Sequence, residues 1–199
     1  MIYLFQIIVL VLSAVMHEYM HGFVAYRLGD RTAKDAGRLT LNPFKHLEWF
    51  GSFFLPLVMI ISNMPFLFAW AKPVPYNPYN LKDKKYGEAK VAIAESLGNL
   101  IIALFFGLFI RMFPMLNITF LSLLSVIVYI NLILAVFNLV PIPPLDGSKV
   151  LAAFLSPRAR EKFLSLERFG LVLVILFVML AGSTIVPVVG FLFDLIVGK

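Results

Sequence analysis

Long hydrophobic runs separated by short polar connections make up most of this chain. Each run approaches or exceeds the roughly 20 apolar residues that a helix needs to cross the hydrocarbon of a bilayer. The runs cover residues 2–26, 50–71, 91–113, 118–140 and 169–197. The last run is interrupted by Gly-Ser-Thr and by Pro187, so it is either one tilted span or a hairpin. The pattern predicts a bundle of membrane helices without internal repeats.

Composition agrees with a membrane protein. The chain is 61% hydrophobic and 14% charged, whereas about 25% of the residues of a soluble domain are charged. Its 199 residues leave no room for a second substantial soluble domain. We therefore predict an all-α polytopic membrane protein with one membrane-embedded domain, residues 1–199. Its core covers about residues 2–155, and a hydrophobic segment, 169–197, follows.

The basic residues are concentrated in three connections, 27–49, 72–90 and 141–168, which hold 15 of the 17 Lys and Arg residues. By the positive-inside rule, all three lie on the cytoplasmic side. Membrane topology therefore accounts for the formal net charge of +6. We expect the lipid bilayer to be a partner and do not expect nucleic acid to be one. Cysteine is absent, which excludes thiolate metal ligands.

Three cytoplasmic connections require the run 50–71 to enter and leave the membrane at the same face. Gly51, Pro56 and Pro65 interrupt this run, and the proline-rich sequence after it does not continue a helix. Re-entrant backbone is tolerated only where protein or a water-filled cavity satisfies it, so we predict a re-entrant segment that lines a cavity. An ordinary span with a basic external loop is the alternative.

Three ionisable residues lie inside the first hydrophobic run, in the sequence HEYMH, residues 17–21. Ionisable groups in a membrane helix are costly and indicate a functional site. His17 and His21 are four residues apart, so they share one helix face and can bind one metal ion. Glu18 projects about 100° further round, where it can act on a bound water. Two structural histidines that satisfy polar groups are the alternative.

A third metal ligand is expected, because catalytic zinc usually takes three protein ligands and keeps one position for water. The sequence NLVPIPPLDG, residues 138–147, supplies Asp146 just after prolines that stop the fourth hydrophobic run. If residues 50–71 are re-entrant, Asp146 and His21 lie on the same side of the membrane. The alternative role for Asp146 is to cap the helix that follows.

Together, HEYMH, PVPYNP (residues 73–78) and NLVPIPPLDG resemble the motifs of the site-2 protease family. These are intramembrane zinc metalloproteases, peptidase family M50, and the resemblance is to the compact form without a PDZ domain. It covers about residues 13–155. It implies one Zn²⁺ per chain bound by His17, His21 and Asp146, with Glu18 as the general base and Asn138 as an oxyanion donor.

The resemblance implies an endopeptidase that hydrolyses peptide bonds in or near the transmembrane segments of membrane proteins, as in regulated intramembrane proteolysis. Its active site is expected to open to the cytoplasmic side, in a prokaryote that of the cell membrane. The alternative is a catalytically silent membrane protein that binds zinc and single-span partners.

Substrate contacts are expected from residues 73–78, because an extended stretch can pair with an unwound substrate by β-addition. Its prolines limit its donors, so a purely structural turn is the alternative. Residues 37–43, GRLTLNP, could form a short β-strand beside it. The candidate substrate-binding residues are Pro75, Asn77 and Asn99.

One position departs from the family pattern. Family members usually carry Gly-Pro shortly before an Asn in the third helix, whereas this chain has Glu95 and Ser96 before Asn99. Three roles for Glu95 are open. Its side chain reaches the cytoplasmic interface, pairs with a basic loop residue, or approaches the zinc and weakens activity.

Overall fold

The computed structural model describes residues 2–62 and 72–198, and all regular structure in that part of the chain is helical. The elements in order are α1 (Ile2–Arg27), α2 (Thr32–Asp35), η1 (Pro43–Lys45), η2 (Trp49–Phe54), α3 (Leu55–Ile61), η3 (Pro78–Asn80), α4 (Gly87–Met112), α5 (Ile118–Asn138), α6 (Asp146–Ala152), α7 (Pro157–Leu164), η4 (Ser165–Phe169), α8 (Gly170–Ala181), η5 (Gly182–Thr184) and α9 (Ile185–Val197). The prediction of an all-α protein is confirmed.

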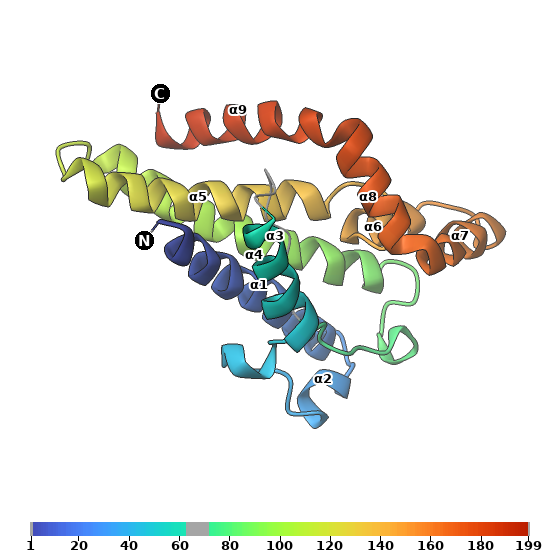
Figure 1. Cartoon of the computed structure of the whole chain (residues 1–199). Coiled ribbons are helices and arrows are strands. Elements are labelled where there is room, and N and C mark those ends of the chain that lie inside the picture. The colour runs from blue at the N-terminus through green and yellow to red at the C-terminus, as the bar shows by residue number, and fades with distance from the viewer. Residues whose placement is uncertain (1, 63–71, 199) are drawn as a thin grey trace.

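Four helical stretches are long and apolar enough to cross a membrane: α1, α4, α5 and the continuous stretch Pro157–Val197. In Figure 1, α4 lies at the centre of the bundle, and α1, α5 and α9 pack against it. The C-terminal end of α1, the N-terminal end of α4 and the exit of α5 into α6 all lie at one end of the bundle. Chemical groups at these three helix ends can therefore meet.

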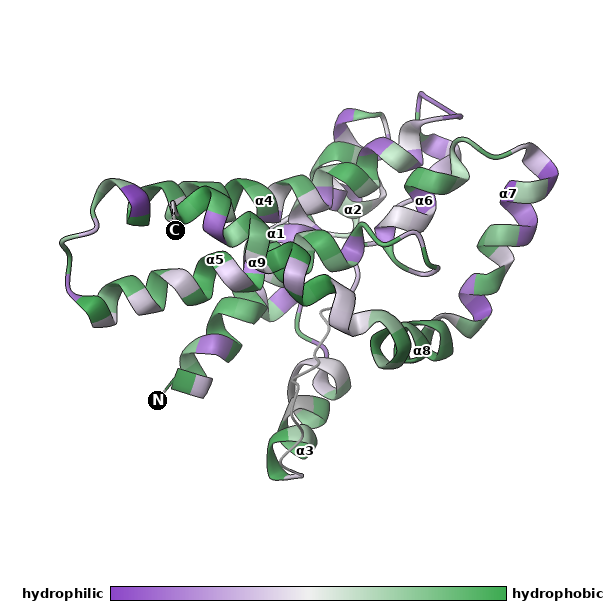
Figure 2. Cartoon of the chain, turned by 90° about the horizontal axis from the view of Figure 1, so that it is seen from above, coloured by the Kyte–Doolittle hydropathy of each residue, from purple (hydrophilic) through white to green (hydrophobic). Residues whose placement is uncertain are grey.

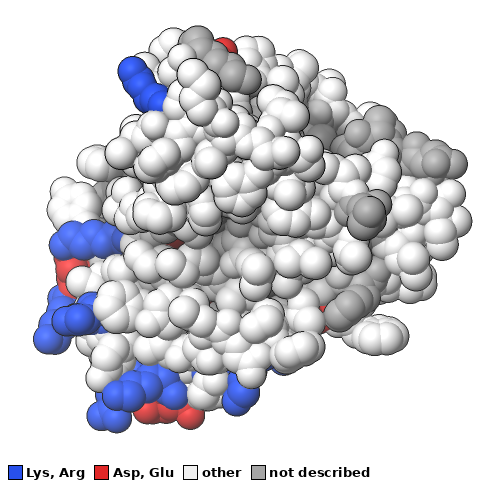
Figure 3. Space-filling model, turned by 90° about the vertical axis from the view of Figure 1, so that its left-hand side faces the viewer, with Lys and Arg blue, Asp and Glu red and all other residues white. Residues whose placement is uncertain are grey.

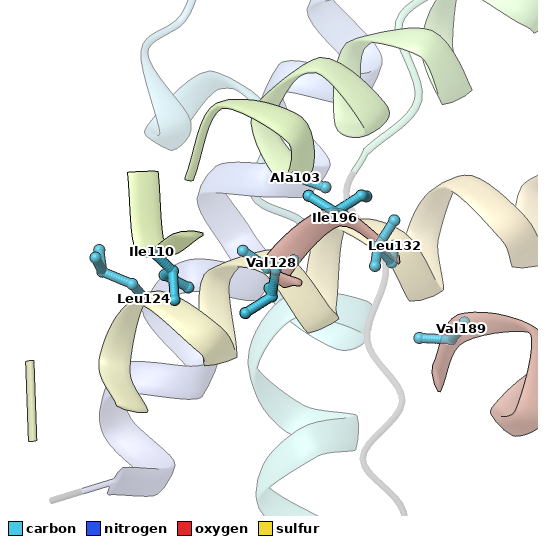
Figure 4. Close-up of a cluster of buried hydrophobic side chains, with 8 residues drawn as sticks. Ala103, Ile110, Leu124, Val128, Leu132, Val189 and Ile196 are labelled. Atoms are coloured by element: carbon cyan, nitrogen blue, oxygen red, sulfur yellow. The ribbon is translucent and has the colours of Figure 1, made fainter. Parts of the chain in front are cut away.

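The core between α4, α5 and α9 consists of small and branched apolar side chains (Figure 4). Gly107 of α4 allows α9 to approach closely, because a Cβ atom there would lie 2.3 Å from Cγ2 of Ile196. Lipid tails are as apolar as these side chains, so close packing between small residues stabilises helix pairs in a membrane. The buried members of this core are Ala103, Ile110, Leu124, Val128, Leu132, Val189, Ile196 and Val197.

The outer surface of the bundle is apolar. Large hydrophobic side chains such as Leu171 and Val172 of α8 and Phe105 of α4 are exposed, which suits an integral membrane protein in a lipid bilayer. Polar residues gather around α2, α6 and α7 (Figure 2). In Figure 3, uncharged side chains cover most of the face in view, and Lys and Arg lie mainly along its lower left rim.

The predicted re-entrant segment returns to the place where it leaves the bundle. The backbone N–H of Lys72 donates to the carbonyl oxygen of His46 over 2.7 Å, so the two ends of residues 47–71 lie side by side. The helical part of this segment, Trp49–Ile61, is too short to be a candidate span. This geometry supports the same-face return over an ordinary span. The rest of the predicted run, residues 63–71, lies outside the described residues.

The expected β-strand at residues 37–43 is wrong, since the described part of the chain contains no strand. Gly37 has a φ of +63° and follows α2. The side chain of Asn42 then accepts a hydrogen bond from the N–H of Phe44 and caps η1, with Pro43 in its first turn. Local capping therefore takes the place of pairing with a neighbouring strand.

The C-terminal segment lies within one candidate span, Pro157–Val197, that contains a bend, which favours a single span over a hairpin. Helix α8 ends at η5, where the chain bends, and α9 turns back along α4 and α5 (Figure 1). Helices in a hairpin pack along their length, whereas α8 and α9 meet only through η5. The bend leaves α8 at the edge of the bundle with its apolar side chains exposed.

Candidate functional site

The two histidines of HEYMH face the interior of the bundle from α1. Their side chains are 12% and 15% exposed for His17 and His21. The helix has no other charged residue before Arg27 except Glu18, so the polar face exists only at this turn. The ring of Tyr76 packs edge-on against His21, with 4.5 Å between ring centroids.

His17 is oriented by a chain of buried amides. Its Nδ1 lies 2.9 Å from Oδ1 of Asn99. The Asn99 Nδ2 donates to the Ser13 carbonyl and to Oδ1 of Asn131, and Asn131 in turn donates to the Ser13 hydroxyl. Because both donors of Asn99 are used, its Oδ1 accepts from His17, and Nδ1 carries the proton. The other ring nitrogen, Nε2, is therefore free to act as a metal ligand.

Asp146 reaches His17 from a separate element. Its Oδ2 lies 3.2 Å from Nε2 of His17, at the first residue of α6. The chain turns so tightly here that a Cβ atom on Gly147 would lie 2.1 Å from the carbonyl oxygen of Leu139. The N-cap of α6 is Leu145, and no side chain caps this helix. The alternative role of Asp146 as a helix cap is therefore wrong.

Glu95 of α4 lies between the two histidines. Its Oε2 is 2.8 Å from Nε2 of His17, and its Oε1 contacts Nδ1 of His21. The residue is only 3% exposed, so the interpretation that its side chain reaches the cytoplasmic interface is wrong. In the described part of the chain its ion pairs are with histidines and not with Lys or Arg. Of the three open roles, the structure supports the approach to the metal ligands.

These side chains fit a metal ion. Ligand atoms of His17, Glu95 and Asp146 all lie within 4.8 Å of one another, and His21 joins them through its contact with Glu95. Two of the oxygens, Oε1 of Glu95 and Oδ2 of Asp146, are buried without a hydrogen-bond partner. Imidazole and carboxylate groups are ligands that Zn²⁺ accepts, and a cation would satisfy both oxygens.

Glu18 lines a cavity of about 280 Å³ beside this cluster, together with Asn138 and Lys149. The backbone N–H of Val74 donates to Oε2 of Glu18 over 2.7 Å, which holds the carboxylate in the cavity wall. Lys149 pairs with Glu167, and burial lowers the pKa of its ammonium group, although the charges of nearby carboxylates act in the opposite direction. The cavity therefore places the fixed carboxylate of Glu18 next to the cluster of His17, Glu95 and Asp146.

Comparison with known proteins agrees with this chemistry. The model of the family described as Peptidase family M50 matches residues 53–183. A Bacillus subtilis protein, YwhC, provisionally named a zinc metalloprotease, is 36% identical over 189 residues, which cover 90% of this chain and 82% of YwhC. The chain belongs to peptidase family M50. It is a zinc metalloprotease of the site-2 protease type.

A second relative of this M50 peptidase is Rip2 of Mycolicibacterium smegmatis, also provisionally named a zinc metalloprotease. It is 28% identical over 165 residues, 82% of this chain and 62% of Rip2. No solved structure matches. The family match begins after HEYMH and contains Glu95, Asn99, Asn138 and Asp146. The B. subtilis relative extends the similarity to 90% of the chain.

Of the residues expected to bind substrate in this M50 peptidase, Asn99 is fully buried. Both ends of its amide are used by His17, Ser13 and Asn131. It therefore lies behind His17 and does not line the cavity, which corrects its expected contact with substrate. Its buried amide positions His17 instead.

The stretch 73–78 offers few donors for β-addition. The N–H of Val74 is taken by Glu18, and the N–H of Asn77 donates to Oδ2 of Asp30. The side chain of Asn77 caps η3 by accepting from the N–H of Tyr79. Pro75 is exposed next to the cavity wall formed by Val74 and Tyr76. These contacts support the structural-turn interpretation, with Pro75 left as a surface that a substrate could touch.

Asp30 of this M50 peptidase is a structural residue that the sequence pattern does not reveal. It is 1% exposed, and its carboxylate accepts from the N–H and hydroxyl of Thr32, the N–H of Asn77 and the amide of Asn80. Burial alone would raise the pKa of Asp30, but these hydrogen bonds hold it below its ordinary value. Asp30 thereby ties the stretch that carries Val74 to the end of α1.

Proposed function

We propose that this M50 peptidase is an intramembrane endopeptidase that hydrolyses peptide bonds in or near the transmembrane segments of membrane proteins. One observation carries the proposal: His17 and Asp146 meet, 3.2 Å apart, beside Glu18 in a cavity within an apolar helix bundle. A peptide bond in hydrocarbon is out of reach of water, and a polar cavity enclosed by helices supplies water at membrane depth.

We assign one Zn²⁺ per chain to His17, His21 and Asp146. A zinc ion held there would lower the pKa of a water ligand to about 7 and would polarise the substrate carbonyl. His17 is prepared for this role by Asn99, which fixes the proton on Nδ1. The chain thus provides two imidazoles and one carboxylate, the ligand number typical of a catalytic zinc site.

Glu18 is the proposed general base. It accepts the proton of the attacking water and returns it to the leaving amine. The hydrogen bond from the N–H of Val74 fixes one carboxylate oxygen, which orients the other. A fixed base contributes more than a mobile one, because the proton transfer then needs no reorganisation of the side chain.

Asn138 is the proposed oxyanion donor. In the described conformation its Nδ2 donates to the carbonyl of Leu134, one turn earlier in α5, while its side chain lines the cavity. Its amide nitrogen carries two N–H groups, so a second donor is available for the oxyanion.

The cavity is proposed to open to the cytoplasmic side, which in a bacterium is that of the cell membrane. Six residues of α1 separate His21 from Arg27, so the histidine lies roughly 9 Å inside the basic boundary. The cysteine-free chain allows this to be tested with single cysteines at Lys34 and Lys84. Both should react with a membrane-impermeant thiol reagent only from the cytoplasmic side. Labels on opposite sides would contradict the topology.

The main test is cleavage of single-span substrates by the purified protein in liposomes, with Glu18→Gln as the matched control. We expect wild type to cleave and Glu18→Gln to lose at least about 100-fold of the rate, because general-base catalysis contributes 10²–10⁴-fold. Zinc content should be equal in both proteins. If wild type cleaves a broad substrate panel no faster than Glu18→Gln, the proposed activity is wrong.

The second candidate function is a silent zinc protein that binds single-span partners without cleaving them. The observation that favours it is the position of Glu95 against both histidines, where family members usually carry Gly. A silent protein would bind a single-span peptide in liposomes without a product. The double variant Glu95→Gly with Ser96→Pro restores the family pattern, and cleavage by this variant alone would support the silent function.

A further inference from the structure

Each oxygen of Glu95 faces a different histidine. Oε2 lies 2.8 Å from Nε2 of His17, and Oε1 contacts Nδ1 of His21. The Nε2 of His17 is also 3.2 Å from Oδ2 of Asp146. The carboxylate of Glu95 therefore occupies the centre of the cluster, and ligand atoms of His17, Glu95 and Asp146 lie within 4.8 Å of one another.

Glu95 pairs with His17 and His21, and with no Lys or Arg in the part of the chain that the structure describes. The two nearby cations that could approach the cavity are engaged elsewhere, since Lys149 pairs with Glu167 and Arg160 pairs with Glu88. A carboxylate that is 3% exposed is costly unless a cation or hydrogen bonds compensate it. Its Oε1 contacts Nδ1 of His21 but forms no hydrogen bond of ordinary geometry, so a cation bound between the two carboxylates would compensate the buried charge.

We propose that Glu95 is a fourth protein ligand of the metal, in addition to His17, His21 and Asp146. This inference rests on the proposed function only in taking those three residues as the metal site. The resulting site contains two imidazoles and two carboxylates. Glu95 lies in the N-terminal half of α4, so that one ion bound to this site would join α4 to the histidines of α1 and the aspartate of α6.

A fourth ligand has two consequences. Catalytic zinc sites keep one position for water, and in a zinc ion held by all four residues Glu95 would take that position. A second carboxylate also favours harder divalent ions, because oxygen ligands suit Mn²⁺ better than imidazole does. The site should therefore hold its metal tightly and discriminate less strongly between Zn²⁺ and Mn²⁺.

The test is direct metal binding by the purified protein in detergent, with Zn²⁺, Mn²⁺ and the spectroscopic probe Co²⁺. Removal of the ligand in Glu95→Gln should weaken Zn²⁺ binding by more than about tenfold, the lower limit for residues that only orient ligands. The visible bands of bound Co²⁺, which report the number and type of ligands, should shift. Mn²⁺ binding should weaken by a larger factor than Zn²⁺ binding.

Glu88→Gln is the matched control. Glu88 lies two turns earlier on α4 and lines the same cavity, but its carboxylate pairs with Arg160. The Glu88→Gln substitution removes one negative charge, as Glu95→Gln does, but at a carboxylate that does not pair with His17 or His21. The metal affinity and the Co²⁺ spectrum should therefore stay as in wild type. Glu95→Gly is the second variant. Because family members usually carry glycine there, it should fold and give the same loss of affinity as Glu95→Gln.

The failures of the two proposals can be told apart. If wild type binds Zn²⁺ and both Glu95 variants bind it with unchanged affinity and an unchanged Co²⁺ spectrum, Glu95 is not a ligand and only this inference is overturned. If wild type binds none of the three ions, the metal site itself is wrong and the proposed function fails with it. A count of four protein ligands by X-ray absorption on the Zn²⁺-loaded wild type would support the inference without any variant.

Discussion

Oδ1 of Asn99 lies 2.9 Å from Nδ1 of His17, although the two residues are 82 positions apart in the sequence. This hydrogen bond joins α4 to α1 and leaves Nε2 of the histidine facing Glu95 and Asp146. Asn99 is fully buried, as is its partner Asn131. A polar network of this kind is retained in an apolar bundle only where its hydrogen bonds are satisfied.

Asn99→Ala should weaken metal binding by about 10- to 100-fold, as the loss of a residue that orients a histidine ligand does. The conservative variant Asn99→Asp keeps an oxygen acceptor at the same position and should retain more of the affinity. Zn²⁺ affinity is the measurement, and thermal unfolding of the metal-free proteins is the control for a general loss of stability. Equal Zn²⁺ affinity in wild type and Asn99→Ala would contradict the positioning role.

Gly147→Ala should abolish metal binding and lower the unfolding temperature. Its Cβ atom would lie 2.1 Å from the carbonyl oxygen of Leu139 and 2.5 Å from that of Val140, so the turn has to open and Asp146 moves away. The matched control is Gly190→Ala in α9, where no atom lies within 4 Å of the added Cβ. This control should be neutral or stabilising by about 0.5–1 kcal/mol. Zn²⁺ content and thermal unfolding distinguish the two variants.

Asp30 should stabilise the protein at neutral pH but not in acid. Burial raises its pKa, but hydrogen bonds from Thr32, Asn77 and Asn80 outweigh burial and lower the pKa in the folded state. A lowered pKa means that the stabilisation is present above the unfolded pKa of about 4 and is lost as the pH falls through the folded value. Asp30→Ala should therefore lower the unfolding temperature at pH 7 much more than at pH 3.

Asp35→Ala is the control for this pH dependence. Asp35 is an exposed carboxylate, 3.7 Å from Arg31, and such surface pairs contribute little to stability. Its replacement should change the unfolding temperature slightly and equally at both pH values. An equal loss for Asp30→Ala at pH 7 and pH 3 would show that the carboxylate charge is irrelevant.

Arg160→Met should release α7 from the bundle. Arg160 pairs with Glu88 of α4, and both side chains are partly buried. Removal of one partner leaves the other without its counter-charge in a partly desolvated position. Hydrogen exchange of residues 157–164 should become faster, while exchange of the core of α5 stays unchanged. An equal change in α5 would instead indicate a general loss of stability.

The sequence predicted the parts of this site that follow from local spacing and from topology. His17 and His21 share a helix face because they are four residues apart. Asp146 was expected near them because the charge pattern requires residues 50–71 to turn back. In the structure, Oδ2 of Asp146 lies 3.2 Å from Nε2 of His17. The first expectation follows from the helix period and the second from the side of the membrane on which each connection lies. Both can be read from the positions of residues along the sequence.

The contacts that were missed depend on distances between helices. The sequence left three roles open for Glu95, because the rotation of α4 relative to α1 is set by packing and not by the α4 sequence. Asn99 was assigned to substrate for the same reason, whereas its partners Ser13 and Asn131 come from two other helices. The bend at η5 was also open, since Gly182 and Pro187 permit a kink without fixing its direction.

The hydrogen bond between the backbone N–H of Lys72 and the carbonyl of His46 joins the two residues that flank the segment 47–71. The N–H of Val74, which donates to Glu18 beside the metal-binding residues, follows this hydrogen bond in the chain. Doubling the length of a closed loop costs only about 0.6 kcal/mol of closure entropy. A change in the number of residues between His46 and Lys72 should therefore cost little closure entropy and leave the hydrogen bond from Val74 to Glu18 in place.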